Sequence, residues 1–84
     1  MLTAAQIRAA RALLGWSQPT LATAAGLSLP TIVRMEGQQG PGRSAAVNVD
    51  AVQRALEKGG VEFIPADEAS GAGVGVRLKQ RPSN

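Results

Sequence analysis

The chain has 84 residues, which is enough for one domain with a single modest hydrophobic core. It contains no Cys, no His and no Tyr, so disulfides and thiolate metal sites are excluded and an enzyme is not expected. The net charge is +3 and lies entirely in residues 1–47, with four arginines and one glutamate, which favours a polyanionic partner.

A first helix is expected over residues 4–14, with Thr3 as its N-cap. Gln6 stands three residues after Thr3, which is the spacing of a capping box. Apolar residues then recur at helical spacing, whereas Arg8 and Arg11 fall outside that apolar stripe. We therefore predict that these two arginines form a solvated helix face.

Two short helices are expected next, over residues 18–25 and 29–36, capped by Ser17 and Ser28. Each has a proline in its first turn, where the missing N–H would have no helical partner. Gly26 supplies the positive φ of a tight turn between them, so the pair is predicted to be a helix-turn-helix. Apolar positions of both helices have the spacing to share one core: Leu21, Ala25, Leu27, Ile32 and Met35.

Residues 37–47 are rich in glycine and are typical of a loop. Asn48 is then expected to cap a fourth helix over residues 49–58, which places Val52 and Leu56 in the core. The pair Gly59-Gly60 ends it.

The pattern changes to alternation after the fourth helix. Residues 61–64 and 74–79 are predicted to be strands of a β-hairpin. An isolated hairpin is marginal in water, so this one must pack on the helices or pair with a second chain. The sequence leaves both arrangements open. A dimer would use the apolar residues of the hairpin: Val61, Phe63, Val74, Val76 and Leu78.

The expected fold is therefore mainly α, with a compact four-helix domain over residues 1–60 and a short C-terminal β-hairpin over residues 61–80. Residues 81–84 are expected to form a disordered tail. No apolar run approaches the roughly 18 residues of a membrane span, and arginines interrupt the N-terminal apolar pattern, unlike a signal peptide. We expect a cytoplasmic protein without metal or cofactor.

The segment SQPTLATAAGLSLPTIVRMEG, residues 17–37, contains a set of residues at fixed spacing. The set is Ser17-Gln18, Leu21-Ala22, Gly26-Leu27-Ser28, Thr31-Ile32 and Glu36-Gly37. It resembles the phage-repressor type of helix-turn-helix, the XRE or Cro/repressor family, which is also called lambda repressor-like. The resemblance covers about residues 2–58, and the hairpin that follows is similar to a run in short bacterial members.

The resemblance implies a sequence-specific DNA-binding transcriptional regulator that acts as a homodimer. Residues 28–36 would be the recognition helix in the major groove of a pseudo-palindromic operator. Gln18 would bond a phosphate or brace the recognition helix. The family's contact positions are occupied by Ser28, Leu29, Thr31 and Arg34. Arg43, in the loop that follows, is a further candidate for the DNA backbone.

Leu29, Pro30 and Val33 stand where family members often have polar residues. Apolar side chains cannot read hydrogen-bond donors and acceptors, although leucine and valine can contact thymine methyl groups. These three apolar residues favour the alternative function of a protein-interaction module, such as an anti-activator or an antitoxin-like partner.

Three side chains have alternative structural interpretations. Glu36 is expected to cap or pair near the end of the third helix, because a carboxylate repels phosphate. Trp16 is expected to close the edge of the core. The alternative to a DNA contact for Arg34 is a salt bridge to Glu36 or Glu57.

Overall fold

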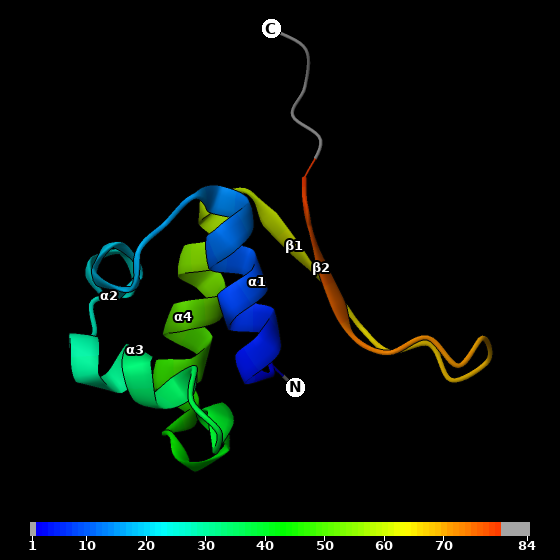
Figure 1. Ribbon diagram of the computed structural model, residues 1–84, viewed down its shortest axis with the longest axis horizontal. Coiled ribbons are helices and arrows are strands. Elements are labelled where there is room, and N and C mark those ends of the chain that lie inside the picture. The colour runs from blue at the N-terminus through cyan, green and yellow to red at the C-terminus, as the bar shows by residue number, and fades with distance from the viewer. Residues whose placement is uncertain (1, 80–84) are drawn as a thin grey trace, which may run out of the picture.

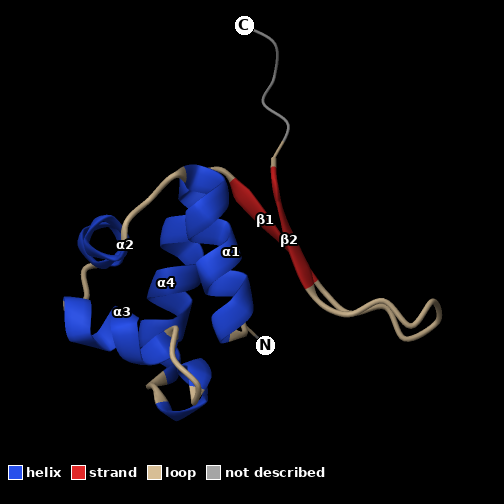
Figure 2. Cartoon of the chain, in the orientation of Figure 1, coloured by secondary structure: helices blue, strands red, loops and turns tan. Residues whose placement is uncertain are grey.

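A computed structural model describes residues 2–79. Helices form the body of the molecule and a β-hairpin leads away from it (Figures 1 and 2). The elements are α1 (Ala4–Leu14), α2 (Gln18–Ala25), α3 (Leu29–Met35), the 3₁₀ helix η1 (Gly40–Arg43), α4 (Ala46–Gly59), β1 (Val61–Ile64) and β2 (Gly75–Leu78). The predicted mainly helical fold with a C-terminal hairpin is confirmed. The predicted tail, residues 81–84, lies outside the described residues.

The N-terminus of α1 has the predicted capping box. Thr3 Oγ1 accepts the Gln6 N–H at 3.1 Å, and Gln6 Oε1 accepts the Thr3 N–H at 2.9 Å. Gln6 also reaches the hairpin, because its Nε2 donates to the Gly75 carbonyl at 3.0 Å. This buried side chain therefore caps the start of α1 and bonds to the first residue of β2 at the same time.

Both helices of the helix-turn-helix begin with the same pattern, Ser-x-Pro-Thr. In α2 the Ser17 hydroxyl accepts the Thr20 N–H at 3.1 Å, and in α3 the Ser28 hydroxyl accepts the Thr31 N–H at 3.3 Å. The turn between them depends on Gly26, whose φ of 71° is unfavourable for other L-residues. The caps and the turn are where the sequence places them.

The core lies where the helices meet. Five of the seven residues predicted for it are fully buried: Leu21, Ile32, Met35, Val52 and Leu56. Trp16, Ala25 and Leu27 are half-buried against this core, and Trp16 closes its edge as expected. Trp16 lies so close to α4 that a Cβ on Gly59 would stand 2.8 Å from its ring.

The predicted start of the fourth helix is wrong. α4 begins at Ala46 after Ala45, which has no side-chain cap, and Asn48 lies within the first turn. The backbone N–H of Asn48 donates to the Ala45 carbonyl at 2.9 Å. Alanine is a strong helix former, so its propensity outweighs the preference of asparagine for a cap. The preceding glycine-rich segment also contains η1 rather than an irregular loop alone.

The two strands pair antiparallel within one chain, from Val61 opposite Leu78 to Ile64 opposite Gly75. β2 is therefore shorter than the predicted strand over residues 74–79. One face of the hairpin packs on α1 and α4. The other carries the Glu62–Arg77 ion pair, in which Arg77 Nε lies 2.6 Å from Glu62 Oε1. Of the helices described within residues 2–79, none is long and apolar enough to cross a membrane.

Candidate nucleic-acid interface

The candidate interface is the exposed face of α3. Ile32 and Met35 turn into the core and anchor this seven-residue helix, and of its other positions only Thr31 is half-buried. Leu29, Val33 and Arg34 are all exposed. The face therefore combines one cation with two large apolar side chains.

The hydroxyl groups at the start of α3 are already engaged. Ser28 Oγ and Thr31 Oγ1 lie 2.9 Å apart and share one hydrogen bond, and Ser28 also caps the helix. A hydroxyl keeps spare lone pairs and a rotatable proton, so a further bond to a phosphate oxygen remains chemically feasible. Their first role in the structure, however, is to hold the N-terminus of α3.

Arg34 has no ion-pair partner among residues 2–79. Both carboxylates proposed as alternatives, Glu36 and Glu57, leave it unpaired in the described part of the chain. Arg43 is also exposed, at the end of η1. Two guanidinium groups on or next to α3 are thus available to phosphate or to a guanine edge.

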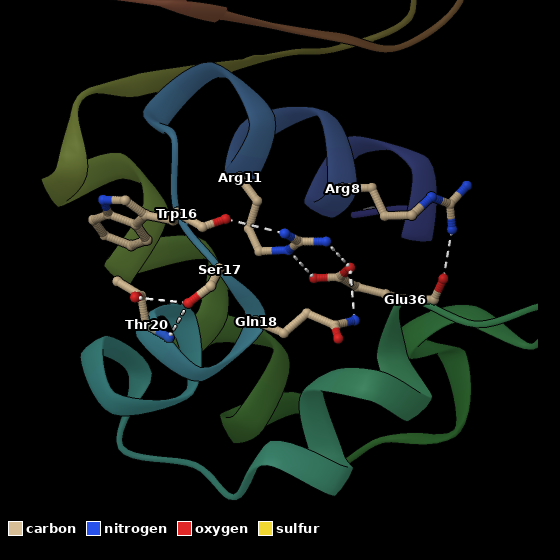
Figure 3. Close-up of polar contacts among 7 residues, drawn as sticks. All are labelled: Arg8, Arg11, Trp16, Ser17, Gln18, Thr20 and Glu36. Carbon is tan, nitrogen blue, oxygen red and sulfur yellow. Dashed lines mark hydrogen bonds and ion pairs between the residues drawn. The ribbon is translucent and has the colours of Figure 1, made fainter.

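A buried ion pair fixes the end of α3 against α1 (Figure 3). Arg11 Nε and Nη2 donate to the two oxygens of Glu36, each at 2.7 Å. The Glu36 side chain is 3% exposed and the Arg11 side chain 21%. Hydrogen bonding to Glu36 raises the pKa of Arg11 above its usual value, against the opposing effect of burial, so the guanidinium stays charged.

Three more hydrogen bonds surround the Arg11–Glu36 ion pair. Gln18 Nε2 donates to Glu36 Oε1 at 3.2 Å, Arg11 Nη1 donates to the Trp16 carbonyl at 3.0 Å, and Arg8 Nη1 donates to the Glu36 carbonyl. The expected structural role of Glu36 is confirmed. The prediction of a solvated face is wrong for Arg11, whose guanidinium pairs with the buried Glu36 carboxylate. Arg8 is exposed as predicted, although one of its N–H groups bonds to the Glu36 carbonyl.

The same contacts determine the charge of the interface. Glu36 is the only acidic residue among residues 1–47, and its carboxylate is buried and neutralised by Arg11. The segment that contains α1, α2 and α3 therefore presents no exposed carboxylate to a polyanion. Gln18 lies at the first position of α2 with its amide directed to Glu36, as expected for a bracing residue.

The residues proposed for a dimer interface are divided between two environments. Val61 is fully buried, and Phe63 and Val76 pack against the core of their own chain. Val74 and Leu78 are exposed. The hairpin therefore uses much of its apolar face within the chain, and any partner would meet the two exposed side chains and the strand edges.

Several features of the interface were not predicted from the sequence. The ion pair joins residues 25 positions apart, and the Gln6–Gly75 hydrogen bond joins residues 69 positions apart. A local pattern cannot find such pairs, although the single acid in a basic segment was a signal for Glu36. The chain matches no family model, curated protein or solved structure with which it was compared.

Proposed function

We propose that this protein is a cytoplasmic, sequence-specific DNA-binding transcriptional regulator of the phage-repressor type. In this proposal α3 enters the major groove and the start of α2 faces the DNA backbone. Arg34 bonds a guanine edge or a phosphate, and Gln18, Ser28, Thr31 and Arg43 contact the backbone. Leu29 lies on the face that meets the bases.

The observation that carries the proposal is Arg34, which is exposed and has no ion-pair partner among residues 2–79, on a helix that its neighbours hold in place. The core contacts of Ile32 and Met35 fix one side of α3, and the Arg11–Glu36 pair fixes its end. A recognition helix must hold its side chains in fixed positions, because direct readout of bases depends on the geometry of each hydrogen bond. The absence of an exposed acid among residues 1–47 removes a source of repulsion by phosphate.

The proposal includes a homodimer, which gives an operator of two inverted half-sites about one helical turn apart. Among the described residues of the hairpin, Val74 and Leu78 are the large apolar ones that remain exposed for this contact. Sedimentation tests the dimer directly. A monomer at micromolar concentration would contradict it.

A binding selection from a random duplex pool tests the DNA-binding function. The salt concentration should be about 100–150 mM, because non-specific attraction to DNA weakens steeply with salt. We expect enrichment of an inverted repeat. Binding that is equal for all duplexes and disappears with added salt would contradict sequence-specific recognition.

A protein-interaction module is the second candidate function, and the exposure of Leu29 and Val33 favours it. Apolar anchors are common at the centres of protein interfaces. Arg34→Ala separates the two candidates, because it should weaken specific DNA binding by about 1–3 kcal/mol but leave most of the affinity for a protein partner. A selection without enrichment would direct the search to that partner.

A further inference from the structure

Leu29 and Val33 form an apolar pair on the candidate interface. The two residues are 40% and 47% exposed, although the other large apolar residues of α3 are fully buried. They stand four residues apart, so they lie on the same face of the helix, one turn from each other. Arg34 adjoins Val33 in the chain and is exposed as well.

No polar side chain of α3 covers Leu29 and Val33, so a ligand that binds this face contacts the pair directly. Ser28 and Thr31 bond to each other, and Pro30 has neither a side-chain polar group nor an N–H. Arg34 is the one charged residue of α3, and the exposed surface beside it is formed by the apolar Leu29 and Val33. A DNA site for this helix must provide an apolar group where Leu29 and Val33 lie.

The thymine 5-methyl group is the apolar group that unmodified DNA presents in the major groove. An α-helix rises about 1.5 Å per residue, so the pair is separated by about 6 Å along the helix axis. Stacked base pairs are about 3.4 Å apart. When α3 lies along the groove, the two side chains meet base pairs about two steps apart.

We infer that Leu29 and Val33 are specificity-determining residues that contact the 5-methyl groups of two thymines, about two base-pair steps apart, in each operator half-site. The inference rests on the proposed DNA-binding function and states which bases that site prefers. Arg34 follows Val33 in the chain, so it bonds the guanine edge or the phosphate next to the second thymine.

Replacement of thymine by deoxyuridine tests the inference, because it removes the methyl group and keeps every hydrogen-bonding group of the base. The duplex is the site enriched in the random selection, with each thymine of a half-site replaced in turn. Burial of one methyl group corresponds to about a fourfold change in affinity, so two replacements should weaken binding about fourfold each.

Matched variants assign each methyl group to its side chain. Leu29→Ala should remove the difference between thymine and deoxyuridine at one position, and Val33→Ala should remove it at the other. Leu29→Met should keep it, because methionine retains an apolar contact. Val47→Ala removes the same atoms from an exposed valine on α4, and it should leave both differences unchanged.

The outcomes separate this inference from the proposed function. An enriched site that binds equally well with deoxyuridine at every position would overturn the inference and leave the DNA-binding function standing. The same holds if the methyl dependence persists in both alanine variants, because DNA shape would then be its cause. A selection without any enrichment would overturn the proposed function and the inference together.

Discussion

Glu36→Gln is expected to destabilise the fold strongly. The carboxylate accepts two bonds of 2.7 Å from Arg11 with only 3% of its side chain exposed. Glutamine keeps the shape, but its amide nitrogen is a donor that would face a donor of the guanidinium. One bond is then lost, and the Arg11 charge lies in a partly buried site without a counter-charge.

The size of the effect follows from the burial of the pair. Removal of one partner of a buried ion pair costs about 3–5 kcal/mol, and the 21% exposure of Arg11 places this pair near the lower limit. A loss of about 3 kcal/mol in a domain of this size lowers Tm by roughly 12–24 °C. Thermal unfolding followed by far-UV circular dichroism measures this shift.

Glu62→Gln is the matched control. Its partner Arg77 also lies within bonding distance, at 2.6 Å, but the two side chains are 64% and 47% exposed. An exposed ion pair contributes less than about 1 kcal/mol, so Tm should change by only a few degrees. Equal losses of Tm for the two variants would refute the reasoning, because burial would then not determine the effect.

Three further substitutions test the contacts that hold the fold. Gly59→Ala places a methyl group 2.8 Å from the Trp16 ring, so we expect the free energy of unfolding to fall by about 1–3 kcal/mol and the tryptophan fluorescence to change. Gly42→Ala is the control, because its methyl group meets no atom within 4 Å and should not change stability. Gly26→Ala should cost about 1–2 kcal/mol in chemical unfolding, because φ is 71°, and Gly26→Asn should cost less. Gln6→Glu keeps the cap of α1 but loses the donor to β2, so hydrogen exchange in β2 should accelerate while α1 is unchanged.

Local patterns predicted most of the fold. The caps of α1, α2 and α3 and the turn at Gly26 follow from residues within a few positions of one another, which is the range over which such signals act. The buried residues Leu21, Ile32 and Leu56 follow from helical periodicity. The start of α4 was mispredicted because two local preferences compete there, and the alanines prevail over Asn48.

The site was less predictable than the fold. The family resemblance placed Leu29 and Arg34 at contact positions of the third helix, and both residues are exposed in the structure. Arg8 and Arg11 share the partner Glu36, which lies at the far end of the helix-turn-helix in the sequence, and only the folded arrangement of the helices brings them together. Whether a charged residue faces solvent or a buried partner depends on such distant contacts.

The most direct test of DNA recognition by α3 is equilibrium binding of the selected operator by wild type, Arg34→Ala and Arg77→Ala. Both variants remove one arginine, but the hairpin that carries Arg77 lies across α1 from α3 (Figure 1). We expect Arg34→Ala to lose about 1–3 kcal/mol of specific binding and to relax the preference at one base pair, with Arg77→Ala close to wild type. Equal binding by all three proteins would contradict recognition by α3.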